Sequence, residues 1–353
     1  MKLVILGGGF CGAKVAKDLD NYQAIDVTII DEKTFFEYKP GVLKVISDSG
    51  YSDEVLVPYK NFLKKSQILT GKVTKVTPNF VEFEDEKIDY DALLISTGVD
   101  YPVFLENKDN VYTPTTVSSS LEINKKLSNA DTVLIIGGGL IGTEVAAEIV
   151  TKQPEKELKI IHSAERLIER NPKKASDYAR DFLEKRGAEI IFDERVTKNE
   201  DGNFKTDSKS VVEADLGIWC AGIDWNPYFM EGFESSVFTE KGSILVDKYL
   251  RLESYSDVFV GGDITQIDEE KTAQNAKKHA EIITENLKRG RKGKKLLPYR
   301  SAERPLVISL GDTNGILVNK SRIFTGIIPG FLKWAVEYWT LSHYDGLLGK
   351  LGL

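Results

Sequence analysis

The sequence predicts an α/β protein built from two similar parallel-sheet domains, one inserted into the other, and a small C-terminal module. The first observation behind this prediction is a strand, a glycine-rich turn and a helix near the N-terminus, an order that returns about 130 residues later. The second is the length of 353 residues, which is enough for two ordinary domains and an appendage.

The first copy begins with the apolar residues 2–6, followed at once by the pattern Gly-x-Gly-x-x-Gly. Gly7 permits a tight turn, Gly9 lets the backbone approach a pyrophosphate, and Gly12 allows the helix to pack against the strand. The helix N-terminus then presents free N–H groups and a partial positive charge to phosphates. The next strand ends on Asp31, whose carboxylate can accept hydrogen bonds from ribose hydroxyls.

The second copy occupies residues 132–161, and its glycines are Gly137, Gly139 and Gly142. A structural glycine turn could explain one copy, but two copies in the same context favour two Rossmann-like dinucleotide-binding domains. The strand of this copy ends at His162, where a carboxylate would favour NAD and repel the 2′-phosphate of NADP. With Arg166 nearby, the choice between NADH and NADPH stays open. The alternative is a histidine that only caps the strand.

The later strands place the second domain inside the first. Two strands run into Thr97-Gly98 and Ala221-Gly222, and a buried strand ends in Gly262-Asp263 before a helix. We therefore expect a first domain at residues 1–112 and 240–298, a second domain at 113–239, and a C-terminal module at 299–353.

Composition excludes several classes of function. The formal net charge of −7 argues against a nucleic-acid partner, which calls for a basic face. The only two cysteines, Cys11 and Cys220, are too far apart for a Cys-x-x-Cys redox pair. Three scattered histidines show no metal-ligand spacing, so no metal site is expected. Any redox chemistry must therefore use a bound organic cofactor.

Neither a membrane span nor a targeting segment is expected. No apolar run approaches the roughly 18 to 20 residues that cross a bilayer. The first strand begins at Lys2, which leaves no room for a leader before it. We therefore expect a cytoplasmic protein, either free or peripheral on the cytoplasmic face of a membrane.

A C-terminal helix is predicted to begin at Pro329-Gly330. One apolar face of this helix collects Phe331, Leu332, Ala335, Tyr338 and Trp339. Aromatic rings on a short amphipathic helix suit a membrane interface, so peripheral membrane contact is favoured. The alternative is docking on the body of the protein or on a second subunit, which would give a homodimer.

End to end, the sequence resembles the two-domain flavoproteins of the pyridine nucleotide–disulfide oxidoreductase superfamily. It resembles in particular the branch of type II NADH dehydrogenases and apoptosis-inducing-factor-like proteins, including the ferroptosis-suppressor type. Beyond the glycines, the similarity rests on residues 154–163 and 309–315, while the last 30 residues match loosely. The resemblance implies FAD in the first domain, NADH or NADPH as substrate in the second, and a quinone as electron acceptor.

The resemblance also implies which residues approach the cofactors. Asp263 would bind the ribityl and pyrophosphate side of FAD. The backbone at Thr97, Gly98 and Gly222 would lie where the chain crosses between the domains. Cys11 and Cys220 would be structural, which disfavours both the disulfide reductases of the superfamily and its sulfide–quinone reductases.

Three residues are implied for the redox centre itself. Glu144 would lie beside the nicotinamide and the flavin, and Lys44 would pair with it; the alternative is two ordinary surface charges. Ala273 and Gln274 resemble the segment that opens a helix over the flavin and borders the quinone pocket. Lys278 replaces the second glutamine that is usual there, and the alternative is a helix whose start merely contacts the flavin.

The function expected from this resemblance is an FAD-dependent NAD(P)H:quinone oxidoreductase. Hydride would pass from the nicotinamide to FAD, and two electrons would pass on to a quinone. One alternative is a soluble reductase of a small electron-transfer protein, which needs a docking patch in place of an apolar pocket. Another is an apoptosis-inducing-factor-like interaction protein that senses redox state and turns over slowly.

Overall fold

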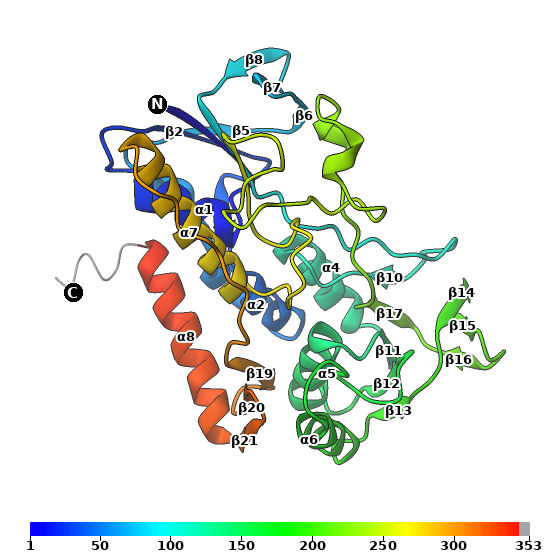
Figure 1. The fold of residues 1–353 in the computed structure, drawn as a ribbon. Helices are drawn as coiled ribbons and strands as arrows, with labels where there is room; N and C mark the ends of the chain where they lie inside the picture. Colours follow the sequence, from blue (N-terminus) through cyan, green and yellow to red (C-terminus); the bar gives the residue numbers. More distant parts are fainter. Residues whose placement is uncertain (346–353) are drawn as a thin grey trace.

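The computed structural model describes residues 1–345, so the last eight residues of the predicted module, 346–353, lie outside the described part. Two five-stranded parallel sheets form the body (Figure 1). The first contains, in spatial order, β18 (Val258–Val260), β9 (Ala92–Ile95), β1 (Lys2–Leu6), β2 (Asp26–Asp31) and β5 (Gln67–Thr70). Its main helices are α1 (Phe10–Leu19) and α7 (Ala273–Arg291), which pack on each other.

The second sheet repeats this plan. Its strands are, in spatial order, β10 (Val111–Tyr112), β17 (Leu216–Trp219), β11 (Thr132–Ile136), β12 (Glu157–Ile161) and β13 (Glu189–Ile191). Its helices are α4 (Val117–Leu127), α5 (Leu140–Lys152) and α6 (Lys173–Glu184). The central strands β1 and β11 each bury four of their five side chains, as expected for parallel strands that are covered on both faces.

Smaller elements complete the two halves. Each half carries a three-stranded antiparallel sheet, either β6 (Val73–Val76), β7 (Phe80–Phe83) and β8 (Glu86–Asp89), or β14 (Val196–Glu200), β15 (Asn203–Thr206) and β16 (Val211–Glu213). The remaining short elements are β3 (Phe35–Glu37), β4 (Leu56–Pro58), α2 (Lys39–Val42), α3 (Tyr59–Phe62) and the 3₁₀ helices η1 (Leu43–Ile46), η2 (Ser49–Val55), η3 (Tyr228–Met230) and η4 (Ser235–Val237).

The pairing of two strands can be compared with the expected limits of the domains. Strand β18 comes after every strand of the second sheet in the chain, yet it pairs with β9 of the first sheet. Strand β10 precedes the expected boundary at residue 112, yet it pairs with β17 in the second sheet. The limits expected for the domains otherwise stay predictions.

The C-terminal part is an antiparallel sheet of β19 (Leu306–Leu310), β20 (Asn314–Asn319) and β21 (Arg322–Gly326), followed by α8 (Ile327–Asp345). In Figure 1, α8 runs along the outside of the molecule, with its first turns against this sheet. The helix starts at Ile327, two residues before Pro329. Proline is tolerated in this first helical turn, because the N–H that it lacks would have no hydrogen-bond partner there. Within residues 1–345, no helix combines the length and the apolar content that crossing a membrane requires.

Candidate active site

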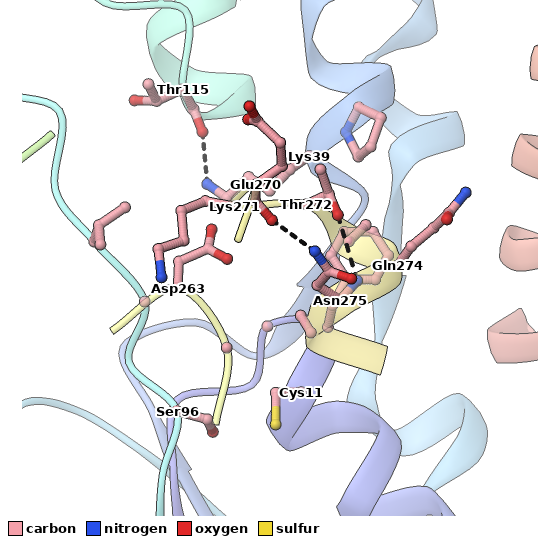
Figure 2. A pocket seen from close by; sticks show the side chains of 18 of the residues that line it. Cys11, Lys39, Ser96, Thr115, Asp263, Glu270, Lys271, Thr272, Gln274 and Asn275 are labelled. Atoms are coloured by element: carbon pink, nitrogen blue, oxygen red, sulfur yellow. Dashed lines mark hydrogen bonds between the residues drawn. The ribbon is translucent and has the colours of Figure 1, made fainter. Parts of the chain in front are cut away.

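The carboxyl ends of the first sheet open into a cavity of about 1970 Å³, part of which Figure 2 shows. Pockets for small ligands usually measure about 300–1000 Å³, so this one has room for an extended dinucleotide and a second molecule. The predicted site residues in its lining are Gly7, Gly9, Asp31, Thr97, Gly98, Glu144, Asp263, Ala273 and Gln274. The predicted site residues outside its lining are Gly12, Lys44, Gly137, Gly139, Gly142, His162 and Gly222.

The first glycine turn has the shape of a phosphate site. A Cβ at Gly12 would lie 1.9 Å from the carbonyl oxygen of Gly7, so only glycine lets α1 pack this close to β1. A Cβ at Gly9 would meet no atom within 4 Å. Gly9 is also the N-cap of α1, and no side chain caps the first turn of that helix. Open space beside helix N–H groups fits the pyrophosphate of a dinucleotide such as FAD.

The second glycine turn reproduces this geometry. Gly139 caps α5 at φ −70° and ψ −166°, and Gly9 caps α1 at φ −70° and ψ −165°. A Cβ at Gly142 would lie 1.8 Å from the carbonyl oxygen of Gly137, while one at Gly139 would meet nothing within 4 Å. The next residues, Leu140 and Ile141, line the large cavity, so the second glycine turn adjoins it.

Asp31 holds the first turn in place. Its carboxylate accepts hydrogen bonds from the backbone N–H of Gly8 and, at 2.7 Å, from that of Lys33. The hydroxyl of Tyr59 donates to the carbonyl oxygen of Gly8 at 3.2 Å. Asp31 therefore shapes the turn and lines the cavity, while its contact with ribose stays a prediction.

Asp263 lies at the cavity wall directly after β18, beside the side chain of Lys271 (Figure 2). Burial raises the pKa of the Asp263 carboxyl, against the opposing charges of Lys271 and His279. The Lys271 ammonium donates to the backbone carbonyls of Thr265 and Ile267, at 2.8 and 3.1 Å. These bonds fix the loop that carries Asp263.

A buried histidine stands behind this loop. Nδ1 of His279 accepts a hydrogen bond from the backbone N–H of Gly262 at 3.0 Å, so its proton is on Nε2, which lies 2.9 Å from the Glu269 carboxylate. Burial raises the pKa of Glu269, but the adjacent His279 and hydrogen bonds from Tyr299 and Ser301 outweigh it and lower that pKa to about 2. Sequence reasoning missed this pair, although a histidine in α7 that follows the Gly-Asp strand was a visible signal.

The start of α7 also faces the cavity. The hydroxyl of Thr272 caps the helix by accepting from the N–H of Asn275 at 3.3 Å, and Nδ2 of Asn275 donates to the Glu270 carbonyl at 2.8 Å (Figure 2). Nε2 of Gln274 donates to the carbonyl oxygen of Pro305 at 3.1 Å. Gln274 thus lies between α7 and the segment that leads into the C-terminal sheet.

The expected pairing of Lys44 with Glu144 is wrong. Lys44 forms its ion pair with Glu337 of α8, at 2.9 Å, and Glu144 forms its own with Lys333 of the same helix, also at 2.9 Å. Glu144 in addition accepts from the N–H of Ser309 at 2.8 Å. The missed signal is the spacing of Lys333 and Glu337, which lie four apart and share one face of an otherwise apolar helix.

Neither Cys11 nor Cys220 forms a disulfide; Cys11 is buried and Cys220 is half-buried. Burial raises the pKa of both thiols, and the charge of Asp263 raises that of Cys11 further. A Cβ at Gly261 would lie 2.5 Å from Sγ of Cys11, so this thiol fills the space between α1 and β18. Within residues 1–345, no group of acidic, histidine and cysteine side chains could hold a metal ion.

The end of β12 differs from the first copy. His162 is buried, and its Nε2 lies 3.1 Å from the carboxylate of Glu169, which is 41% exposed. The guanidinium of Arg166 donates to the backbone carbonyls of Asn171, at 2.8 Å, and Glu169. Glu169 therefore brings a carboxylate close to the end of β12, and Arg166 is engaged with the backbone.

Comparison with known proteins identifies one family and several relatives along most of the chain. The family model described as pyridine nucleotide-disulphide oxidoreductase matches residues 1–280. Apoptosis-inducing factor homolog B of Dictyostelium discoideum is 29% identical over 349 residues, which cover 89% of this chain and 88% of that protein. The type II NADH:quinone oxidoreductase of Staphylococcus haemolyticus is 25% identical over 381 residues, which cover 95% of this chain and 94% of that protein.

Solved structures share the fold. The sulfide:quinone oxidoreductase of Aquifex aeolicus superimposes with a TM-score of 0.85 at 19% identity, covering 98% of this chain and 91% of that one. NDH2 from Plasmodium falciparum in complex with NADH superimposes with a TM-score of 0.84 at 16% identity, covering 98% of this chain and 97% of that one. At these identities the likeness concerns the fold alone.

Proposed function

The chain belongs to the pyridine nucleotide-disulphide oxidoreductase family, and on that premise we propose that it is an FAD-dependent NAD(P)H:quinone oxidoreductase. The observation that carries the proposal is one continuous cavity, which runs from the first glycine turn past Glu144 to the inner side of α8. The similarity to a type II NADH:quinone oxidoreductase and to the ferroptosis suppressor proteins supports the same function.

The residues of the chain would divide the work between binding and positioning. The N-termini of α1 and α5 bind the phosphates of FAD and of the nicotinamide nucleotide, while Asp263 and its loop hold the ribityl side of FAD. When bound, FAD accepts a hydride from the nicotinamide and passes two electrons to the acceptor. Leu140 and Ile141 lie between the second glycine turn and the cavity, where they would position the nicotinamide.

The wall of the cavity suits a quinone. Val307 and Ile308 of β19, Val318 of β20 and Val336 of α8 supply apolar lining near the Glu144–Lys333 ion pair. An apolar pocket with a few polar groups is the usual form of a small-molecule site. This wall favours a quinone over a protein acceptor, which would need only a docking patch.

The nucleotide preference follows from Glu169. Its exposed carboxylate beside His162 would favour NADH, because an acid near the end of this strand repels the 2′-phosphate of NADPH. Arg166 would do little to attract the 2′-phosphate of NADPH, since its guanidinium donates to backbone carbonyls. We expect kcat/KM for NADH to exceed that for NADPH by roughly tenfold, or about 1.4 kcal/mol.

The test of the function is NADH oxidation by the purified flavin-loaded protein, followed optically with and without a short-chain quinone. We expect the quinone to stimulate NADH oxidation at least roughly tenfold, because positioned cofactors turn over at about 1–1000 s⁻¹ in ordinary enzymes. NADPH in the same assay gives the nucleotide preference. A flavin that NADH reduces, but that turns over no faster with quinone, would contradict the proposal and favour a protein acceptor or a sensing role.

Contact with a membrane is the second part of the proposal. The outward side of α8 together with the adjoining strand exposes large apolar residues, here called the α8 apolar face: Phe324, Ile327, Ile328, Phe331, Leu332, Trp334, Tyr338 and Trp339. The opposite side of the helix buries Glu337 and Thr340. A helix with polar groups inward and aromatic rings outward suits the headgroup region of a lipid bilayer.

Sedimentation with phospholipid vesicles tests this contact. Replacing Trp334 and Trp339 together by serine should weaken vesicle binding at least roughly 100-fold, because each buried aromatic ring contributes about 1.5–3 kcal/mol. Val211→Ser, which alters an exposed apolar side chain on β16, is the matched control and should leave binding unchanged. Vesicle binding that is unchanged when the two tryptophans are replaced, or a dimer in solution that buries them, would contradict membrane contact.

A further inference from the structure

Helix α5 carries a buried carboxylate that no step of the proposed function uses. Glu148 lies one helical turn beyond Glu144 and is 3% exposed. Among residues 1–345 no lysine, arginine or histidine lies within ion-pair distance of it, and its hydrogen-bond partner is the hydroxyl of Ser47 in η1. A buried charge is normally paired, so the state of this carboxyl needs an explanation.

The contact with Ser47 is that of a neutral acid. Oγ of Ser47 lies 3.2 Å from Oε2 of Glu148 and 3.1 Å from the carbonyl oxygen of Lys44. A hydroxyl bound to an ionised carboxylate usually lies at about 2.5–2.7 Å. One long bond, shared with a competing carbonyl, cannot replace the water that an ionised carboxylate loses on burial.

The neighbouring charges leave no cation for Glu148. The two lysines of this interface, Lys44 and Lys333, each contact another carboxylate at 2.9 Å, that of Glu337 or Glu144. With Lys152, which is paired with Asp312, three lysines face four carboxylates, and the cluster is neutral only when Glu148 carries a proton. Burial and the charge of Asp312 raise the pKa of Glu148 to about 7, against Lys44, Ser47 and Lys152.

Glu148 lies on α5 between a residue of the surface and a residue of the cavity lining. Glu144, Glu148 and Lys152 are spaced four apart on α5 and so lie on one face of the helix. Lys152 is paired with Asp312 at the surface, and Glu144 lines the cavity. Side chains at this spacing have Cβ atoms about 6 Å apart, within reach of neighbouring glutamate side chains.

We propose that Glu148 stores the proton that quinone reduction draws from solvent and passes it to the cavity through Glu144. This inference rests on the proposed function, whose balance is NADH + H⁺ + quinone → NAD⁺ + quinol. The hydride supplies both electrons and the hydrogen of one of the two quinol O–H bonds. The O–H bond of Glu148 breaks, the proton moves by way of the Glu144 carboxylate, and an O–H bond forms on the quinone oxygen. Solvent then reprotonates Glu148 from the side of Lys152 and Asp312.

The decisive variant is Glu148→Gln, which keeps the shape of the protonated acid but cannot release a proton. We expect kcat with quinone to fall at least roughly 100-fold, with KM for NADH unchanged, because proton transfer by a positioned group contributes about 10²–10⁴-fold. The fall of wild-type activity above pH 7 should be absent from the residual rate of the variant. Glu155→Gln, at an exposed glutamate just beyond α5, is the matched control and should behave as wild type.

A second readout is independent of turnover. The infrared spectrum of the wild type should contain the carbonyl band of a buried protonated carboxyl that titrates near pH 7, and Glu148→Gln should lack this band. The folded-state pKa is raised above the ordinary value of 4.5, so the stability it confers is present below pH 4.5 and lost as pH rises to about 7. The melting temperature of Glu148→Gln relative to wild type should therefore rise across that interval and level off above it.

The outcomes separate this inference from the proposed function. Wild-type protein that reduces no quinone contradicts the function, while the titrating band still reports whether Glu148 is protonated. Wild-type protein that reduces quinone, with Glu148→Gln equally fast, overturns the proton-storing role and leaves the function intact. Absence of the band from the wild type overturns the inference whatever the variant does.

Discussion

Replacing Gly12 by alanine is expected to abolish flavin binding and to destabilise the fold. The added Cβ would lie 1.9 Å from the carbonyl oxygen of Gly7 and 2.6 Å from Oγ of Ser96. The first of these atoms is backbone and cannot turn away, so α1 must move off β1. Forced overpacking of this kind costs typically about 1–3 kcal/mol, and the displaced helix no longer faces the phosphates. Thermal unfolding and the flavin absorbance of the purified protein measure the two effects.

The matched variant is Gly9→Ala. Its Cβ would meet no protein atom within 4 Å, so the protein should fold with a melting temperature close to that of flavin-free wild type. It should nevertheless bind FAD poorly, because the Cβ occupies the space that the pyrophosphate needs. If Gly9→Ala kept its flavin, the first turn would not be the FAD phosphate site.

Gly139→Ala completes the comparison at the second turn. It also adds a Cβ to open space, so the protein should retain FAD and the fold. The KM for NADH should rise, since the altered turn caps α5 beside Leu140 and Ile141. Loss of FAD from Gly139→Ala, with normal use of NADH by Gly9→Ala, would reverse the assignment of the two domains.

Removal of Lys44 is expected to have the second largest effect. Lys44→Met leaves the carboxylate of Glu337, whose side chain is 3% exposed, without its cation. Burial already raises the pKa of Glu337, and Lys44 opposes that rise. Breaking a buried ion pair from one side costs about 3–5 kcal/mol, so the free energy of unfolding should fall by that amount and α8 should become sensitive to proteolysis.

The double variant Lys44→Met/Glu337→Leu is the control for this prediction. Replacing both partners by apolar residues removes the uncompensated charge and should recover most of the lost stability. An exposed pair gives the scale for comparison, because Lys278→Ala breaks the surface contact with Glu281 and should cost at most about 1 kcal/mol. Equal losses for Lys44→Met and Lys278→Ala would mean that the buried pair does not anchor α8.

The glycine turns were the most predictable part of the molecule. Gly7, Gly9 and Gly12 occupy their positions for steric reasons that act within a dozen residues, so the pattern alone gives the geometry. The strands β1 and β11 end where their apolar runs end. The helix α8 was also foreseen, with its start displaced by two residues.

The partners of the charged residues could not be predicted in the same way. The ion pair of Lys44 joins residues 293 apart, and that of Glu144 joins residues 189 apart. Pairs of this kind depend on how α8 lies across the body, which no local pattern specifies. Glu148 shows the same limit, because its sequence neighbours resemble those of an ordinary helical glutamate and only packing against η1 removes it from water.

The placement of α8 also has a consequence for the order in which the protein is completed. The ribosome adds about 5–20 residues per second, so Lys44 waits roughly 15–60 s for Glu337 to be synthesised. Both parallel sheets have all their strands once β18 (Val258–Val260) is made, and from then until α8 follows the cavity lacks the wall that α8 later supplies. A bulky flavin can therefore enter from the open side of a nascent chain. When α8 is made and packs against the body, it encloses a cofactor that is already bound.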